Sequence, residues 1–339
     1  MLAALCLTGC GSAREETASQ NTNKVTKEVF AMDTYMTVTT YGEQAENAAK
    51  QAVDEIERLD GILSTGDPES EIAIVNENGS EIVSEDTAAL IDESLSIYWD
   101  TAGAFDISIY PLMNEWGFTT QKYKVPSAGK IRKLLKKVNA SRITWDESKR
   151  LLTLPDDMEI DLGGIAKGYT SDRLMQIFQK NNLTGGVVSL GGNVQAYGTK
   201  EDGSEWKIAI ENPPTSSLSG DYLGVLQTNG KAVITSGGYE RYFEKKGKTY
   251  HHILDPSTGY PADSGVISST IVSDSGVLAD GLSTSLFVMG KDKAVEYWKK
   301  RSGDFDFVLL LEDGSVWITE GIEDIFSSDF QYEVIHNDK

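Results

Sequence analysis

The sequence predicts an α+β protein with mixed or antiparallel sheets and packed helices. Runs rich in β-branched and aromatic residues follow one another more often than they alternate with helical patterns, which disfavours a doubly wound parallel sheet. The 339 residues are 40% hydrophobic and 24% charged, which is typical of a folded protein with a sizeable core. Because no Pro- or Ser-rich linker divides the interior, we expect one domain at 25–334 and a short tail at 335–339.

The first half of this domain contains both strand and helix patterns. Residues 25–41 are rich in β-branched and aromatic side chains and predict a strand interrupted at 32–34. Apolar residues recur at helical spacing through 43–63, which predicts a long amphipathic helix. We expect further helices at 85–100 and 130–138. A polar turn between two β-prone runs predicts a hairpin at 142–154.

The second half is richer in strands. Helices are expected at 166–180 and 279–298. The last strand pair is joined by Glu312-Asp313-Gly314, where Asp-Gly supplies the positive φ that a tight turn needs. The expected strands are 186–197, 206–210, 223–226, 233–234, 250–254, 305–311 and 315–319.

The net charge argues against one class of partner. The formal charge is −21, from 31 basic and 52 acidic side chains. Nucleic-acid binding depends on clustered Lys and Arg, so we expect no nucleic-acid partner. An acidic surface also repels anionic lipid headgroups, and membrane attachment would therefore require an anchor.

The N-terminus contains a candidate anchor. Residues 1–10 form a short apolar run that ends in Leu-Thr-Gly-Cys10 and resembles the lipobox of bacterial lipoproteins. The run is too short to span a bilayer and is typical of the end of a signal peptide. Cleavage before Cys10 would leave its sulfur for the lipid, and the polar residues 11–24 would form a flexible tether. The pattern predicts an extracytoplasmic, lipid-anchored protein; the alternative is a disordered or cloning-derived tail with incidental cysteines.

Two glycine-rich segments are candidate ligand sites. Asp-Leu-Gly-Gly-Ile-Ala-Lys-Gly-Tyr at 161–169 combines an expected strand end, a glycine pair and a helix start, where a phosphate would find free N–H groups. The pattern is neither a Walker A motif nor GxGxxG, and a plain tight turn is the alternative. In the second segment, at 189–194, Asn193 would either donate to a ligand carbonyl or cap the turn.

The segment 279–284 is a candidate metal site. Asp280 and Thr284 are four residues apart and lie on one helix face, with Ser283 beside them. One carboxylate with one or two hydroxyls is a hard oxygen set suited to Mg²⁺, with waters and substrate phosphates as further ligands. The alternative is that the segment is simply a helix N-cap.

The segment 250–261 holds two of the three histidines. Asp255-Pro256 marks a turn after an expected strand, which would place an imidazole beside a loop. Such a histidine would accept a proton from a hydroxyl nucleophile, or it would be structural. Zinc is disfavoured because the chain after Cys10 has no cysteine and only His336 remains as a further histidine. No Gly-x-Ser-x-Gly motif supports a serine hydrolase.

In combination and in this order, the motifs resemble the ApbE family of flavin transferases. The resemblance covers nearly the whole domain. Its segments are Met32-Asp33-Thr34, 63–76, Gly-Ala-Phe-Asp-Ile at 103–107, 161–169, Leu-Gly-Gly-Asn at 190–193, His252-Ile-Leu-Asp-Pro256 with Thr258-Gly259, and 280–284. The chain departs from the family at Asp33, where members commonly carry glycine, and at Gly66, where an aromatic residue often stands.

The resemblance implies a T-fold-like α+β architecture and Mg²⁺-dependent transfer of FMN from FAD to a Thr or Ser of an acceptor protein, with release of AMP. It implies that Mg²⁺ is held by the carbonyl of Ala166 and by Asp280 and Thr284, with Ser283 close by. His252 and Asp280 would be catalytic. The residues it places against FAD are Met32, Gly66, Ala104, Phe105, Asp106, Gly163, Lys167, Tyr169, Asn193, His252 and Ile253.

Two other functions are compatible with the same residues. Water in place of the acceptor hydroxyl would make the protein an FAD pyrophosphatase that yields FMN and AMP. A lipid-anchored flavin-binding protein without turnover would use the glycine loops equally well. It would have less need of the metal set formed by Asp280 and Thr284.

Overall fold

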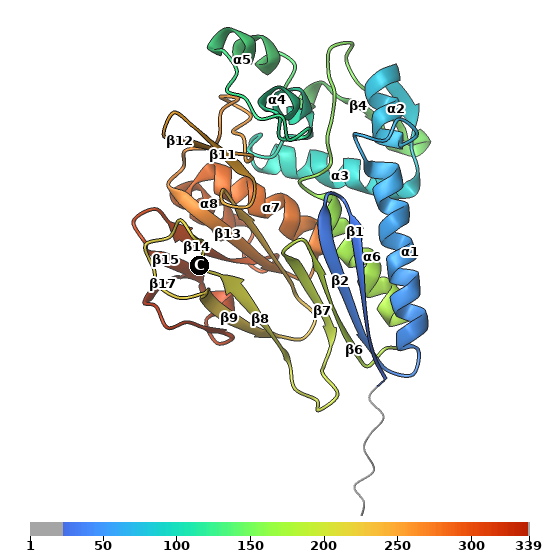
Figure 1. Cartoon of the computed structure of the whole chain (residues 1–339), viewed down its shortest axis with the longest axis vertical. Coiled ribbons are helices and arrows are strands. Elements are labelled where there is room, and N and C mark those ends of the chain that lie inside the picture. The colour runs from blue at the N-terminus through green and yellow to red at the C-terminus, as the bar shows by residue number, and fades with distance from the viewer. Residues whose placement is uncertain (1–22, 338–339) are drawn as a thin grey trace, which may run out of the picture.

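The structure, a computed structural model, describes residues 23–337 (Figure 1). Cys10, the rest of the lipobox and nearly all of the expected tether lie outside these residues. Strand β1 begins at Lys24 and strand β17 ends at Ile335, which is one residue beyond each expected domain boundary. No helix within the described range is long and apolar enough to cross a membrane.

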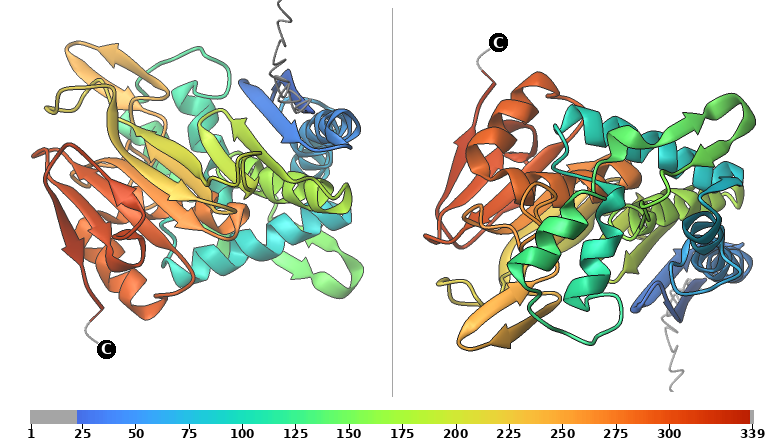
Figure 2. Two further views of the ribbon diagram at one scale, coloured as in Figure 1. Left: turned by 90° about the horizontal axis from the view of Figure 1, so that it is seen from below. Right: turned by 90° about the horizontal axis from the view of Figure 1, so that it is seen from above.

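A nine-stranded sheet forms the centre of the fold, in the order β1-β2-β6-β7-β10-β13-β14-β15-β17. Neighbouring strands are antiparallel except β15 and β17, which are parallel, so the sheet is mixed. The N-terminal hairpin and the C-terminal strands occupy opposite ends (Figure 2). The strands are β1 Lys24–Ala31, β2 Thr34–Tyr41, β6 Gly185–Leu190, β7 Asn193–Gly198, β10 Ala232–Gly237, β13 Val266–Ser273, β14 Asp306–Leu311, β15 Val316–Thr319 and β17 Tyr332–Ile335.

The described residues form eight α-helices, of which α1, α6 and α7 pack directly against this sheet. Helix α1 contacts β1, β2 and α6, while α7 contacts β10, β13 and α6. The helices are α1 Ala45–Leu63, α2 Glu71–Asn78, α3 Glu85–Asp100, α4 Tyr110–Trp116, α5 Ala128–Leu135, α6 Ala166–Lys180, α7 Gly276–Met289 and α8 Lys291–Lys300. A strongly antiparallel sheet with helices packed around it confirms the predicted α+β class.

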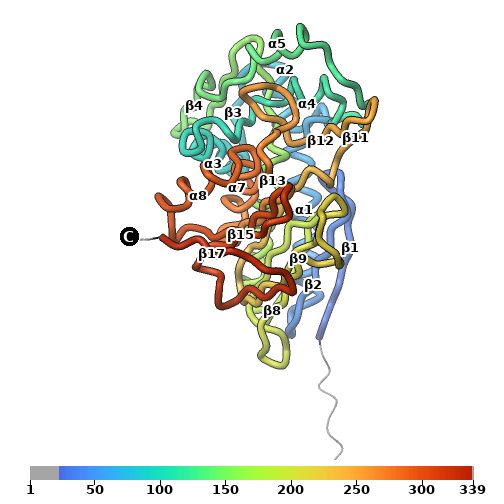
Figure 3. Tube along the Cα trace, turned by 90° about the vertical axis from the view of Figure 1, so that its left-hand side faces the viewer, coloured from blue at the N-terminus to red at the C-terminus, as the bar shows by residue number. Residues whose placement is uncertain are grey.

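Three small sheets complete the fold. Helices α4 and α5 lie with the β11–β12 hairpin at one end of the molecule (Figures 1 and 3). The small sheets are β3-β5-β4 (Ser80–Ile82, Leu151–Thr153, Thr144–Asp146), β11-β12 (Tyr242–Lys245, Lys248–His251) and β16-β9-β8 (Phe326–Ser327, Tyr222–Thr228, Trp206–Glu211).

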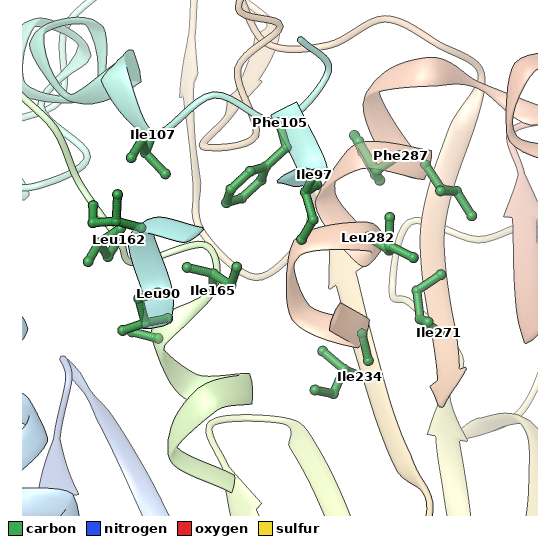
Figure 4. Packing of buried hydrophobic residues seen from close by; sticks show 14 of the residues in the cluster. Leu90, Ile97, Phe105, Ile107, Leu162, Ile165, Ile234, Ile271, Leu282 and Phe287 are labelled. Atoms are coloured by element: carbon green, nitrogen blue, oxygen red, sulfur yellow. The ribbon is translucent and has the colours of Figure 1, made fainter. Parts of the chain in front are cut away.

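The largest core cluster lies between α3, α7 and the central sheet. Figure 4 shows Ile97 of α3 near Ile165, which directly precedes α6, while Leu282 of α7 points toward Ile271 of β13. All four are at most 2% exposed. Burial of each such side chain contributes roughly 1.5–3 kcal/mol to folding. This packing fixes α7 against the start of α6, and the candidate site lies at that junction.

Three expected elements are divided by residues with positive φ. Met32 and Asp33 have φ of 49° and 60°, so 25–41 forms two strands of a tight hairpin. The expected strand at 186–197 is likewise a hairpin, with Gly191 and Gly192 at its turn. The expected helix at 279–298 is two helices, because Gly290 has φ of 77° and ends α7.

Candidate functional site

A cavity of about 1200 Å³ opens among the β1–β2 turn, the start of α6, the end of β10 and helix α7. This volume exceeds the ~300–1,000 Å³ of ordinary small-molecule sites and leaves room for a dinucleotide. The structure brings most of the predicted site residues to its wall. They are Met32, Gly66, Ala104, Phe105, Asp106, Gly163, Ala166, Lys167, Asn193, His252, Ile253, Asp280 and Thr284.

The position of Asp280 depends on how α7 begins. The Asp172 carboxylate on α6 accepts hydrogen bonds from the backbone N–H groups of Gly276 (2.7 Å) and Val277 (2.9 Å). A negative charge at a helix N-terminus also interacts favourably with the helix dipole. The side chain of Ser275 provides the N-cap. The expectation that the helix starts at 279 is therefore wrong, and Asp280 is not an N-cap residue but lies in the second turn.

A close approach of two backbones then places Asp280 beside the start of α6. A Cβ atom built on Gly168 would lie 2.1 Å from the carbonyl oxygen of Gly276 and 2.6 Å from the Asp280 Cβ. Only glycine fits at this distance. The two helices therefore touch where one contributes Lys167 and the other contributes Asp280.

Three groups hold the Asp280 carboxylate, which is 4% exposed. The Gly168 N–H donates to Oδ2 at 2.8 Å, and the Asn193 amide donates to Oδ1 at 3.0 Å. The Lys167 ammonium lies 3.9 Å from Oδ1. The sequence predicts that Asn193 either donates to a ligand carbonyl or caps its turn. In the structure its side-chain amide instead donates to the Asp280 carboxylate and orients it. A charged oxygen atom is thus held in a fixed direction at the cavity wall.

The other predicted metal ligands lie within one turn of Asp280 or at the start of α6. Thr284 lines the cavity, and its hydroxyl is 3.2 Å from the Ser236 hydroxyl. Ser283 is fully buried, and its hydroxyl donates to the Asp280 carbonyl at 2.8 Å. The Ala166 carbonyl accepts a hydrogen bond from Thr170 at 2.8 Å and keeps a second lone pair.

The chemistry of this donor set fits a hard divalent cation. Asp280, Thr284 and Ala166 offer a carboxylate, a hydroxyl and a carbonyl, which are all oxygen donors. Residues 23–337 contain no group of three or more His, Cys, Asp and Glu side chains that could hold a metal ion. A cation at this wall would therefore need waters and substrate phosphates to complete its coordination, as Mg²⁺ commonly does.

His252 is the histidine that lines the cavity. Its Nδ1 lies 3.3 Å from the Arg241 carbonyl oxygen. Because a carbonyl only accepts, this contact requires the proton on Nδ1 and leaves the lone pair on Nε2. Burial and the positive charge of Arg241 lower the pKa of His252 to about 3. The imidazole is consequently neutral at physiological pH.

Further charged residues line the same wall. Lys167 and Arg241 supply positive charge suited to phosphate oxygens. Burial raises the pKa of Glu240 to about 7, and the nearby Asp280 carboxylate adds to the shift. Glu240 and Arg241 were not among the residues predicted from the sequence. Their position shortly after the β-prone run of β10 was the available signal.

Two predicted residues lie outside the cavity lining. The Tyr169 hydroxyl donates to Asp86 at 2.6 Å, inside an ion-pair network with Arg58 and Arg173. Ser283 lies behind Thr284 and does not line the cavity. The Asp106 carboxylate accepts from Ser108 and Ala140 N–H groups, so it stabilises its own loop although the residue lines the cavity.

Known proteins resemble this chain over most of its length. The model of the ApbE family matches residues 32–309. The FAD:protein FMN transferase of Haemophilus influenzae is 33% identical over 263 residues, covering 75% of this chain and 76% of that protein. The corresponding protein of Salmonella typhimurium is 30% identical over 323 residues, covering 92% and 91%.

Solved structures show the same fold. The crystal structure of the ApbE protein from Thermotoga maritima matches with a TM-score of 0.83 and 33% identity, over 89% of this chain and 99% of that one. The apo flavinyl transferase ApbE of Pseudomonas stutzeri matches with a TM-score of 0.80 and 26% identity, over 91% and 98%. With a family match over most of its length and relatives that share its fold, the chain belongs to the ApbE family.

Proposed function

We propose that this chain transfers FMN from FAD to a threonine or serine hydroxyl of an acceptor protein, with Mg²⁺ as cofactor and AMP as the leaving product. The observation that carries the proposal is that Asp280, Thr284, Lys167 and His252 all line one cavity. The relatives named FAD:protein FMN transferase support the same activity. Their name implies both FAD and an acceptor protein.

The residues that would hold Mg²⁺ are Asp280, Thr284 and the carbonyl of Ala166. When bound, the ion supplies Lewis acidity and neutralises charge on the substrate diphosphate. Lys167, 3.9 Å from Asp280, would bring a further positive charge to the phosphate oxygens. Asn193 and the Gly168 N–H keep the carboxylate oriented while substrate enters.

In the transfer step, the acceptor hydroxyl oxygen forms a bond to the FMN-side phosphorus of FAD. The bond between that phosphorus and the bridging oxygen breaks, and AMP leaves with the electron pair. The hydroxyl proton passes to Nε2 of His252, which carries the free lone pair in the tautomer set by Arg241. A positioned proton acceptor of this kind contributes about 10²–10⁴-fold to a rate.

Replacing His252 by asparagine is expected to lower kcat for transfer by roughly 10²–10⁴-fold. Because its pKa is about 3, the wild-type imidazole stays neutral and kcat/KM should not fall through His252 protonation between about pH 5.5 and 8. The check is the pH profile of both proteins. A wild-type profile that falls below pH 6.5, with the fall absent in the variant, would contradict the lowered pKa of His252. A His252→Asn protein that transfers FMN at the wild-type rate would contradict its role as proton acceptor.

The function itself is tested by mass spectrometry of an acceptor domain that carries an exposed Ser/Thr flavinylation motif. The domain is incubated with this protein, FAD and Mg²⁺, against an EDTA control. A mass gain of one FMN phosphoester that EDTA abolishes is the expected result. Free FMN and AMP with an unmodified acceptor would indicate FAD hydrolysis, and FAD that stays intact would indicate a flavin-binding protein without turnover.

We propose further that the protein is extracytoplasmic and lipid-anchored through Cys10. The supporting observation is the lipobox-like sequence that ends at this residue, followed by a polar segment. Replacing Cys10 by serine is expected to move the protein from the membrane fraction to the soluble fraction. Equal membrane association of both proteins after cell fractionation would overturn the anchor.

A further inference from the structure

Strand β8 presents an unpaired edge to the cavity. It is the last strand of the small sheet β16-β9-β8 and pairs only with β9 in the described chain. The four consecutive residues 208–211 of β8 all line the cavity. Successive side chains of a strand point to opposite faces, so an unbroken run of lining residues indicates that the strand's edge faces the cavity. Backbone N–H and C=O groups on such an edge are free to pair with another strand.

A second lobe of about 620 Å³ continues the cavity at the end of β8. Ala209, Glu211 and Pro214 line both spaces, so the two spaces adjoin. The lobe is lined mainly by residues of the loop that connects β8 to β9. A molecule lying along β8 would therefore extend from the lobe into the cavity that holds Asp280.

The polar groups of the lobe distinguish it from the phosphate-binding wall. Its lining includes the carboxylates of Glu211 and Asp221 and, among these described residues, no Lys or Arg. Two acidic side chains would repel the diphosphate of FAD, which is attracted instead to Lys167 and Arg241. We therefore expect the lobe to bind a ligand other than FAD.

Asn212 gives an independent sign that the lobe binds a ligand. The residue is 8% exposed and lines the lobe. Its amide nitrogen donates to the carbonyls of Leu218 and Gly220. Its Oδ1 has no hydrogen-bond donor among the described residues. A buried acceptor without a partner calls for an explanation, and a donor brought by a ligand is one.

We propose that the acceptor protein binds as an extended segment that pairs with the free edge of β8, occupies the acidic lobe and so delivers its hydroxyl into the cavity. This inference rests on the proposed transfer function. In such strand addition, main-chain hydrogen bonds supply affinity and side-chain pockets supply specificity. FAD and acceptor then approach the reacting phosphorus from two sides of one cavity.

The kinetic test compares Ala209→Trp with Lys207→Trp. Both residues are exposed and lie on the same face of β8, but only Ala209 lines the cavity and the lobe. We expect Ala209→Trp to raise the KM for the acceptor domain by about tenfold or more, and by a larger factor than the KM for FAD. Lys207→Trp should leave both values near wild type. Equal acceptor KM values for the two variants would overturn the proposal.

Hydrogen exchange tests the strand pairing directly. The probe is an acceptor domain whose target threonine or serine is replaced by valine or alanine, so that it binds without reacting. We expect the backbone amides of β8 to exchange more slowly in its presence. Unchanged exchange rates in β8, with slower exchange in other segments, would refute the proposal. If wild-type protein fails to modify the unaltered acceptor, the transfer function fails; if it transfers FMN while β8 stays unprotected, only this inference fails.

Discussion

Replacing Asp280 by alanine is expected to lower FMN transfer by about a thousandfold or more, because the proposed Mg²⁺ would lose its carboxylate ligand and with it several kcal/mol of charge stabilisation at the phosphates. The change also removes the hydrogen-bond acceptor of the Asn193 amide and the Gly168 N–H. Donors left without a partner in a buried site cost about 1–3 kcal/mol each. The measurements are in-gel flavin fluorescence of the acceptor and transfer rate as a function of Mg²⁺ concentration.

Asp274 provides the control for this variant. It lies six residues before Asp280, outside the cavity, and its side chain is 83% exposed in an ion pair with Lys231. Asp274→Ala should therefore transfer FMN at the wild-type rate. If Asp280→Ala transferred FMN at that rate with the same Mg²⁺ dependence, the metal site would have to lie elsewhere.

The variant Asp280→Asn tests the contribution of the negative charge of Asp280 apart from that of the size and shape of its side chain. An asparagine keeps the volume and one oxygen acceptor but loses the negative charge that attracts a cation. Because only one of the two donors to Asp280 keeps an acceptor, we expect this variant to recover part of the stability lost in the alanine variant while transfer remains low. The two variants together distinguish loss of the cation ligand from collapse of the surrounding hydrogen bonds.

Elements with strong local signals were predicted well from the sequence. Helices α3 and α6 have the predicted bounds, 85–100 and 166–180. For α3 the signal is an N-cap, because the Ser84 hydroxyl accepts from the Thr87 N–H, followed by acidic residues in the first turn. Such signals act within a few residues and remain visible in one sequence.

Strand β13 was not predicted, although it is central to the sheet. Seven of its eight residues are buried, including several serines and threonines, so the strand shows no alternation of polar and apolar residues. Its Thr270 hydroxyl finds a partner only in the folded sheet, in Thr235 of β10. The information that makes this segment a strand lies in its neighbours.

Most candidate site residues could be predicted from the sequence, but their arrangement could not. Lys167 and Tyr169 belong to one motif, yet two residues in a helix are rotated by about 200°, so only Lys167 points into the cavity. The contact of Asn193 with Asp280 spans 87 residues of sequence and depends on the packing of α6 against α7. Distances of that kind arise from tertiary structure, and local spacing does not encode them.

Gly168→Ala is expected to destabilise the protein and to impair transfer together. The new methyl group would lie 2.1 Å from the Gly276 carbonyl oxygen and 2.6 Å from the Asp280 Cβ, and both contacts involve atoms with little freedom to move. The helices would have to separate, at a cost of roughly 1–3 kcal/mol or more for overpacking. The gain of about 1 kcal/mol in helix propensity from glycine to alanine does not offset this cost.

Gly61→Ala is the matched control, because Gly61 lies in α1 and has nothing within 4 Å of its added Cβ. This variant should be stabilised by up to about 1 kcal/mol and should transfer FMN normally. Urea unfolding measures the free energy of unfolding of each protein, and acceptor flavinylation measures transfer. Because Gly168→Ala moves Asp280 relative to Lys167, its transfer rate should fall even in dilute buffer where the protein stays folded. A Gly168→Ala protein as stable and as active as Gly61→Ala would show that the contact between α6 and α7 does not position the carboxylate.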